Sequence, residues 1–317
     1  MELYYSSLSD VGNVRTNNED CLFTGKLKKD CWLFVVADGM GGHDAGEVAS
    51  YEAVTMLTRA LKKETDENLT EALKNIVLDI NEALINKGKK VSDHKGMGTT
   101  LSALYIKKNF GYVVHVGDSR IYRHSKSGLV QLTEDHSLVG KLLKNGFITE
   151  SEAQSHPKRN VLYQSVGLKQ GIEVQTMGPF PVRMGQKFLL CSDGLNNEVP
   201  DSEIEHIMHF KSTRQIVDHL IQRAKAGTAA DNITVVAVST EEDDSTEIDK
   251  TVRLTVPVNV RKKRKKKVGL LILLGLLVLL LAALIYFLVQ DSQKEGDGRM
   301  VSPPVAKGGD NGRQTIR

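Results

Sequence analysis

The sequence is poor in cysteine, and the few cysteines present argue against two common ways of stabilising a fold. Only Cys21, Cys31 and Cys191 occur among 317 residues, an odd number without C-x-x-C spacing. A disulfide framework and a cysteine-bound zinc are therefore not expected. Cys31 and Cys191 lie in apolar runs, where cysteine behaves as a small buried hydrophobic residue.

Three other signals are also missing. The first residues, MELYYSSLSDVG, have neither the basic start nor the apolar core of a secretory signal, so we expect the N-terminal body to stay in the cytoplasm. No H-E-x-x-H motif or Cys/His cluster offers ligands to zinc. No repeat with a period of 20–50 residues is visible, which argues against a solenoid.

The net charge of +3 conceals an uneven distribution of charge. The run 261–267 (RKKRKKK) holds seven consecutive cations, so residues 1–260 are net acidic. An acidic body argues against nucleic-acid binding, and against a nuclease, because both need a basic face toward phosphates. It suits a site that gathers carboxylates around cations.

One long hydrophobic run stands directly after these cations. Residues 268–289 (VGLLILLGLLVLLLAALIYFLV) are 22 residues without a charge. As a helix they would be about 33 Å long, enough to cross a hydrocarbon core of about 30 Å. Basic residues beside a span stay on the cytoplasmic side. We therefore predict a single-pass protein of the cell membrane, with a transmembrane helix at 268–289 and the N-terminal body in the cytoplasm.

The span divides the rest of the chain. Residues 1–240 form the expected body. Residues 241–267 begin with EEDD, show no convincing helix or strand pattern, and are expected to form a linker that ends in the basic run. That run could also bind anionic headgroups. Residues 290–317 are rich in Gly, Pro and polar groups, and we expect a short disordered tail outside the membrane.

Within the body, short β-branched and aromatic runs alternate with amphipathic stretches, which predicts an α+β fold. The expected strands are 33–37, 99–106, 112–116, 120–123, 187–191 and 233–238, and the expected helices are 45–62, 67–88, 201–208 and 212–226. Strands 99–106, 112–116 and 120–123 follow so closely that we expect an antiparallel meander. The irregular stretch 134–182 is either a surface excursion or a flap beside a site.

Five aspartates lie at the ends of predicted strands, in turns with Gly or Asn. One such turn is ordinary local chemistry. Together, however, carboxylates on rigid strand ends can converge at one edge of a sheet, where they repel unless cations compensate. An all-oxygen set suits Mg²⁺ or Mn²⁺. These aspartates are Asp20, Asp38, Asp118, Asp193 and Asp231.

Two further residues fit such a site. Gly39 directly follows Asp38, so the backbone can approach a ligand closely and the Gly39 carbonyl can bind metal. Arg15 lies shortly before Asp20, and its planar fork can take two phosphate oxygens at once.

The motifs form an ordered series: G-x-x-R-x-x-N-E-D at 12–20, DGMGGH at 38–43, GTT at 98–100, GDSR at 117–120, SDG at 192–194 and DN at 231–232. This series resembles the type 2C metal-dependent serine/threonine protein phosphatases, in particular bacterial single-domain members that counteract membrane-bound serine/threonine kinases. The resemblance covers about residues 2–240. It implies an antiparallel β-sandwich flanked by helices on both sides, in α-β-β-α layers.

The resemblance also implies a first metal site. Asp38 would bridge two core Mn²⁺ or Mg²⁺ ions. The Gly39 carbonyl and either Glu19 or Asp20, directly or through water, would serve one of them.

The second core ion would be held by Asp193 and Asp231 in the same comparison. Asp118, with Asp193, would hold a weaker third ion. Arg15 would bind the substrate phosphate, and residues 136–165 would match a variable flap.

The implied reaction is direct hydrolysis of phosphoserine and phosphothreonine in proteins by metal-activated water, opposing a protein kinase. No nucleophilic cysteine in a phosphate loop is visible, which agrees with it. One position departs from the better-known eukaryotic members, whose general acid is a histidine where this chain has Met40. His43 or a metal-bound water could serve instead. A catalytically silent phosphopeptide- or kinase-binding module on the same fold is the alternative.

Overall fold

The computed structural model describes residues 1–41, 45–65, 68–90, 94, 96–149, 152–153, 156–241, 253–254, 281 and 283. The chain divides into two units, Met1–Arg261 and Lys262–Arg317, and the account below concerns the first. The expected tail 290–317 and all but two residues of the expected span 268–289 lie outside the described part. Within the described part, no helix is both long and apolar enough to cross a bilayer.

Two antiparallel sheets form the centre of the first unit. One has the strand order β1-β12-β11-β8-β9, the second β10-β7-β6-β3-β2-β13, and a short pair β4-β5 lies apart. The first sheet comprises β1 (Tyr4–Asp10), β8 (Arg120–Ser125), β9 (Gly128–Gln131), β11 (Lys187–Cys191) and β12 (Ile233–Ser239). The others are β2 (Cys21–Lys28), β3 (Cys31–Ala37), β4 (Gly39–Met40), β5 (Gly98–Thr99), β6 (Leu101–Lys107), β7 (Phe110–Val116), β10 (Gln175–Pro181) and β13 (Arg253–Leu254).

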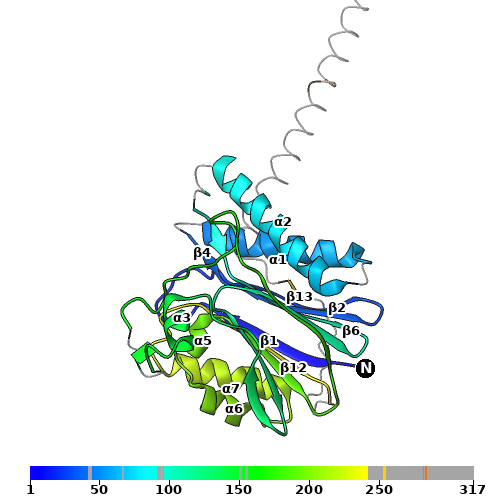
Figure 1. Cartoon of the computed structure of the whole chain (residues 1–317), viewed down its shortest axis with the longest axis vertical. Coiled ribbons are helices and arrows are strands. Elements are labelled where there is room, and N and C mark those ends of the chain that lie inside the picture. Colours follow the sequence, from blue (N-terminus) through cyan, green and yellow to red (C-terminus); the bar gives the residue numbers. More distant parts are fainter. Residues whose placement is uncertain are drawn as a thin grey trace, which may run out of the picture. The chain divides into compact units, whose positions relative to one another are not determined.

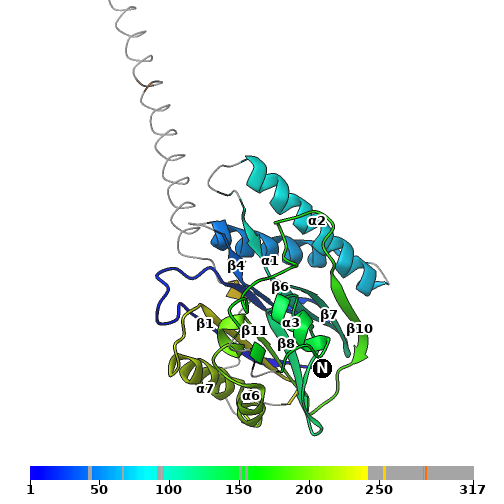
Figure 2. The same cartoon turned by 60° about the vertical axis from the view of Figure 1, so that its left-hand side comes forward.

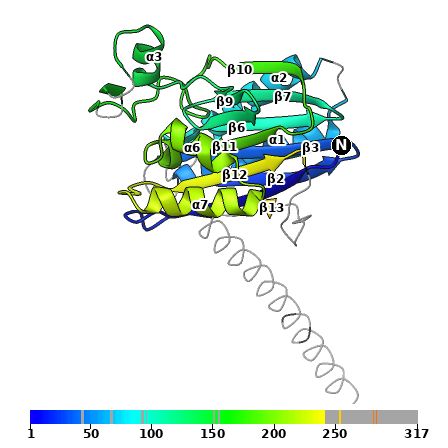
Figure 3. The same ribbon diagram turned by 90° about the horizontal axis from the view of Figure 1, so that it is seen from below.

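Helices cover the outer face of each sheet (Figures 1 and 2). The second sheet carries α1 (Ala45–Lys63) and α2 (Leu69–Lys90), and the first carries α6 (Asp201–Met208), α7 (Thr213–Lys225) and the short α5 (Asp193–Asn196). The expected α-β-β-α layering is therefore confirmed. A separate helix, α3 (Leu138–Lys144), lies outside both helical layers (Figure 3).

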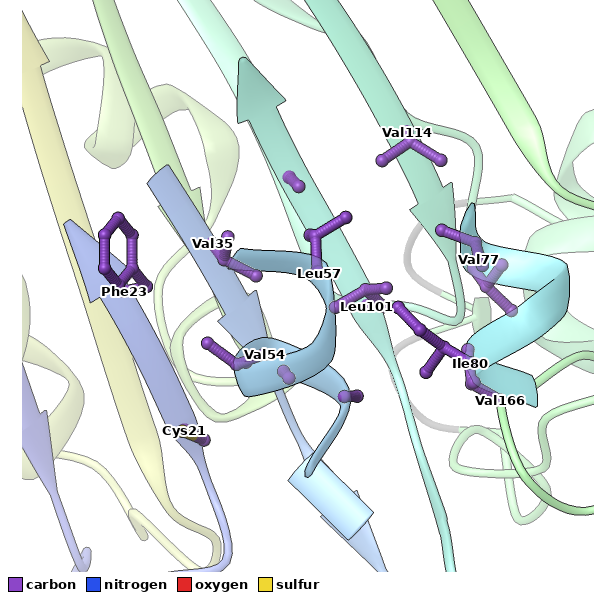
Figure 4. Packing of buried hydrophobic residues seen from close by; sticks show 14 of the residues in the cluster. Cys21, Phe23, Val35, Val54, Leu57, Val77, Ile80, Leu101, Val114 and Val166 are labelled. Atoms are coloured by element: carbon purple, nitrogen blue, oxygen red, sulfur yellow. The ribbon is translucent and has the colours of Figure 1, made fainter. Parts of the chain in front are cut away.

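Strand alternation explains why four layers form. In β3, Leu33 and Val35 belong to the apolar cluster under α1 and α2, whereas Phe34 and Val36 belong to the cluster between the sheets. Figure 4 shows Leu57 of α1 and other residues of the outer cluster. Because both faces of β3 are buried, its sequence is a continuous apolar run, and each such side chain contributes roughly 1.5–3 kcal/mol.

The expected meander is wrong at its third strand. β6 and β7 pair as expected, but β8 pairs with β11 and β9 in the other sheet. The chain changes sheets at Gly117. Its φ of +117° is a conformation that glycine adopts easily and other residues rarely adopt, and a Cβ there would lie only 2.6 Å from Thr100 Cβ. A short connection thus does not guarantee pairing, since a glycine turn can send the chain to the facing sheet.

Other elements were not anticipated. The sequence pattern does not indicate the strands β1, β2, β9 and β10, because polar or glycine residues interrupt their apolar runs. In the expected linker 241–267, β13 pairs antiparallel with β2, Arg253 facing Thr24 and Leu254 facing Phe23. That segment was expected to lack strand structure, and this expectation is wrong for these two residues.

Candidate metal centre and active site

The five predicted aspartates lie at one edge of the sandwich because the strand register brings their strand ends together. Cys21 of β2 faces Ala37 of β3, so Asp20 and Asp38 are neighbours across the second sheet. In the first sheet Cys191 of β11 lies between Arg120 of β8 and Val235 of β12. The turns before or after these residues carry Asp118, Asp193 and Asp231. The edge formed by these strand ends is called the catalytic edge below.

Asp20 is the most deeply buried of the group, with 2% of its surface exposed. Ser192 Oγ and Thr234 Oγ1 donate hydrogen bonds to its Oδ2 at 2.8 and 2.6 Å. Its Oδ1 is buried and has no hydrogen-bond partner in the structure. Burial raises the pKa of Asp20 to about 7, the two hydrogen bonds offset part of this rise, and the charges of Asp193 and Asp231 add to it.

Three other carboxyl groups share this environment. Burial, followed by the charges of Asp20 and Asp193, raises the pKa of Asp38 well above its usual range. Burial and the charge of Asp193 do the same for Asp118. The pKa of Asp193 rises to about 6, chiefly through burial and then through Asp231. These mutual effects show that the predicted carboxyl groups are close enough to repel one another.

Glu19 and the Gly39 carbonyl also approach each other, as the resemblance implied. A Cβ built on Gly46 would lie 2.6 Å from Glu19 Oε2 and 2.9 Å from the Gly39 oxygen. Only glycine at position 46 leaves room for both oxygens. Ser50 Oγ donates to the Glu19 carbonyl at 2.6 Å, and the Glu19 N–H donates to Asn232 Oδ1 at 2.8 Å, which fixes this segment on both sides.

Arg15 lies at the rim of the same site. Its Nη2 donates to Asp231 Oδ2 at 2.9 Å, and its side chain is 52% exposed. Its positive charge also lowers the pKa of Asp193, although burial and Asp231 outweigh it. The predicted phosphate ligand is therefore beside the carboxylates, with half of its side chain open to solvent.

Sequence reasoning missed the uncharged residues that hold the aspartates. The Asp38 N–H donates to Thr100 Oγ1 at 2.8 Å, and that oxygen lies 2.6 Å from Ser119 Oγ. Thr99 Oγ1 donates to the Asp38 carbonyl at 2.9 Å. Thr99, Thr100 and Ser119 stand inside the GTT and GDSR motifs, so the motifs themselves contained the signal.

The predicted flap borders the site, whereas the proton donor stays unassigned. A cleft of about 180 Å³ is lined by Asp118 and Asp193 on one side and by Val139, Leu143 and Arg159 on the other. Met40 belongs to β4 and pairs with Gly98. His43 lies outside the described residues.

The donor set fits divalent cations. Asp20 Oδ1 and Asp193 Oδ1 are buried oxygens without a hydrogen-bond partner, in a cluster whose burial favours protonation unless positive charge is supplied. No three acidic, His or Cys side chains of the described residues are already arranged as direct ligands of one ion. Mg²⁺ needs no such arrangement, because it usually keeps several waters and binds one or two carboxylates directly.

Comparison with known proteins shows the family to which the chain belongs. Residues 13–233 match the family model for protein phosphatase 2C. A serine/threonine phosphatase, Stp, of Listeria welshimeri is 39% identical over 235 residues, which cover 73% of this chain and 93% of Stp.

Solved structures give the same result. Staphylococcus aureus Stp1 superposes with a TM-score of 0.70 at 32% identity, over 76% of this chain and 96% of Stp1. The catalytic domain of the phosphatase PstP, solved with two manganese ions, gives a TM-score of 0.66 at 34% identity, over 75% of this chain and 97% of that domain. With its motif series, layered fold and carboxylate edge, this chain belongs to the protein phosphatase 2C family.

Proposed function

We propose that the chain hydrolyses phosphoserine and phosphothreonine in proteins and depends on Mn²⁺ or Mg²⁺ to do so. The observation that carries the proposal is a convergence of four carboxyl groups with raised pKa values at one edge: Asp20, Asp38, Asp118 and Asp193. Two of them, Asp20 and Asp193, each have a buried oxygen without a hydrogen-bond partner in the structure. Such a cluster is costly unless cations bind, and cations beside an exposed arginine suit a phosphate ester.

Each residue has a definable part. Two divalent cations, when bound, would lower the pKa of a water and neutralise charge on the phosphoryl oxygens. Asp38, the Gly39 carbonyl and either Glu19 or Asp20, directly or through water, would hold one ion. Asp193 and Asp231 would hold the other, and Asp38 would serve both.

Asp118, with Asp193, would hold a weaker third ion. Arg15 would orient the phosphate by two parallel hydrogen bonds, and Asp231 would keep its guanidinium at the rim.

The test is release of phosphate from a phosphothreonine peptide with added Mn²⁺. We expect turnover from the native chain, loss of turnover in Asp38→Asn, and native turnover in Asp79→Asn, which removes an exposed carboxylate on α2. A folded protein that binds the peptide without turnover, even at high enzyme concentration, would show a silent binding module instead. A phosphoenzyme trapped by acid quench would contradict direct hydrolysis.

We also propose that residues 268–289 tether the phosphatase body to the cell membrane on its cytoplasmic side, where it opposes a membrane-bound serine/threonine kinase. The support is the uncharged run and the seven cations before it. Cell fractionation should place the full chain with membranes and a chain ending at residue 260 in the soluble fraction. Recovery of the full chain in the soluble fraction would contradict the tether. Phosphoproteomics of cells carrying Asp38→Asn should show a gain of phosphothreonine in membrane-proximal substrates.

A further inference from the structure

The edge of the sandwich opposite the catalytic edge carries a pocket of a different chemical kind. The strand register places it there, because Arg120 of β8 faces Cys191 of β11 at the catalytic edge, whereas His124 faces Lys187 at the other end. The pocket has a volume of about 370 Å³ and is formed by the turn from β8 to β9 and by the chain between β10 and β11. We call it the basic pocket after its charged lining residues, which are Arg123, Lys126 and Arg183.

The three cations of the basic pocket have no counter-charge among the described residues. None of them forms an ion pair there, and no described residue that lines the pocket is acidic. Glu241 comes near, since its Oε1 would lie 3.2 Å from a Cβ on Gly185, yet it forms no ion pair with Arg183. Lys187, next to the pocket on β11, donates instead to the Met208 carbonyl at 2.9 Å. Cations that lack a partner attract an anion from outside the chain.

Two separate segments bring the arginines to this pocket. Side chains two residues apart on a strand share a face, so Arg123 lies on the same face of β8 as Ile121, which belongs to the apolar cluster between the sheets. Val182 belongs to the same cluster and directly precedes Arg183. Arg123 is half-buried, whereas Arg183 is exposed. Because both line one pocket, a single anion can contact both guanidinium groups.

Hydrogen bonds hold the backbone of both turns. The Arg183 N–H donates to Gln186 Oε1 at 2.9 Å, and the Arg183 carbonyl accepts from Thr240 Oγ1 at 3.0 Å, which ties this turn to the residue after β12. In the turn from β8 to β9, the Ser127 N–H donates to Ser125 Oγ at 3.3 Å. Less backbone freedom is therefore lost when a ligand binds, which favours affinity.

A phosphate ester is the anion that fits the basic pocket best. The planar guanidinium group takes two phosphate oxygens at once, and the lysine adds a point charge. A phosphate held there would not be hydrolysed, because no described lining residue is a carboxylate that could hold a metal ion. Residues 1–260 are net acidic, so most of the surface repels phosphoproteins and the basic pocket is a local exception.

We propose that the basic pocket binds a second phosphoserine or phosphothreonine of a substrate protein while the catalytic edge hydrolyses the first. This rests on the proposed function. From Arg120 to Ser125, β8 spans about 17 Å at about 3.3 Å per residue, so an extended segment needs at least about five residues to join the two sites. The preferred substrates are therefore proteins that carry two or more phosphates well separated along the chain.

Binding to the pocket is tested with the full chain in EDTA, where the carboxylates of the catalytic edge have no ions and repel phosphate. The probe is a fluorescent peptide with one phosphothreonine, followed by fluorescence anisotropy. Arg183→Gln and Lys126→Gln should each weaken its binding about tenfold, because each removes a charge-assisted contact. Arg59→Gln, which removes an exposed arginine of α1, should leave binding unchanged. Equal binding by the native chain and both pocket variants would overturn the proposal.

The effect on hydrolysis is tested with Mn²⁺ and two peptides of the same composition, each with two phosphothreonines. In one the phosphates are about twelve residues apart, enough to reach both sites, and in the other about three residues apart. The native chain should show a KM about tenfold lower for the widely spaced peptide, with a similar kcat. Arg183→Gln should remove this difference and leave turnover of a singly phosphorylated peptide unchanged. Equal KM values of the native chain for both peptides would contradict the proposal.

The outcomes separate this proposal from the proposed function. Phosphate-dependent binding in EDTA that is lost in Arg183→Gln, without turnover of any peptide in Mn²⁺, would reject the proposed function and leave the pocket as a phosphate site. Turnover of all peptides without an effect of spacing would reject the second phosphate alone. If Arg183→Gln weakens binding to vesicles of anionic lipid but not to the phosphopeptide, the pocket binds lipid headgroups and the proposal is wrong.

Discussion

Two groups of buried ionisable side chains lie near each other at the catalytic edge. In one group a carboxylate is paired with an arginine, whereas in the other several carboxyl groups repel one another. Arg120 donates from Nε and Nη2 to Asp135, the latter bond at 2.7 Å, and its Nη1 donates to the Tyr122 hydroxyl at 3.0 Å. Two residues earlier, Asp118 is in a cluster of carboxyl groups whose pKa values are raised. Asp135 is therefore neutralised by a cation of the chain itself, whereas the carboxyl cluster that contains Asp118 needs bound metal ions to offset its repulsion.

The largest expected effect comes from Asp38→Asn, which removes one carboxylate from the cluster. A bound ion contributes several kcal/mol to a phosphoryl transition state, so activity with Mn²⁺ should fall about 1,000-fold, or roughly 4 kcal/mol. The metal-free protein should become more stable at pH 7.5, since one repelling carboxylate is gone. Steady-state assays and thermal unfolding in EDTA measure the two effects, and a destabilised metal-free variant would contradict the charge argument.

Asp135→Asn should have the opposite effect on stability and destabilise the metal-free protein. It removes the nearer counter-charge of Arg120, whose side chain is only 21% exposed, and leaves this mostly buried cation with only the longer 3.6 Å contact to Asp201 Oδ1 as an ion pair. Loss of one partner of such a pair costs about 3 kcal/mol of unfolding free energy. Urea denaturation in EDTA should show this loss. Unchanged stability there would remove the basis of the comparison.

Acidification should stabilise the metal-free protein. The pKa values of Asp20 and Asp193 are raised to about 7 and 6, from 3.8 for an unperturbed Asp, so the folded state binds more protons than the unfolded state between these limits. Unfolding free energy should therefore rise by about 2 kcal/mol from pH 7.5 to 5.5. Saturating Mn²⁺ should cancel or reverse this trend, because protons then compete with the ion.

The smallest expected effect is a difference in stability and Mn²⁺ binding between substitutions at two buried threonines. Thr234→Val removes a hydrogen bond to Asp20 and a 2.7 Å contact with Ser9 Oγ, and should cost about 1 kcal/mol and weaken Mn²⁺ binding about tenfold. Thr24→Val removes a buried hydroxyl that has no hydrogen-bond partner, and should be neutral or stabilising. Calorimetric titration with Mn²⁺ and urea denaturation should distinguish the two variants.

The sequence was sufficient to predict the carboxylate edge because strand ends are fixed by pattern and acidic turns are conspicuous. Asp38 directly follows the apolar run of β3, and Asp193 follows that of β11, so their meeting could be expected before the fold was known. The residue pattern predicts the α+β class, and the resemblance implies the layering, which agrees with the structure because a strand that is apolar on both faces must be covered on both.

Other features depend on contacts that no local pattern specifies. The hydrogen bonds from Ser192 and Thr234 to Asp20 join residues more than 170 positions apart. A serine or threonine in or beside a strand does not by itself indicate which group its hydroxyl binds. The change of sheet at Gly117 depends on close contact with Thr100. The pairing of β13 was missed for a different reason, because the charged and polar residues around it favoured reading the whole segment as a linker.

The pairing of β1 with β12 has a consequence for synthesis on the ribosome. Tyr4 lies opposite Ser239, and Asp20 accepts a hydrogen bond from Thr234, so the first strand has no pairing strand and Asp20 lacks this donor until nearly all of the body has been translated. A nascent chain interrupted anywhere before residue 231 lacks Asp231, one of the carboxylates at the catalytic edge. Incomplete copies of this protein would therefore be silent toward phosphoproteins, and activity would report that translation of the body was completed.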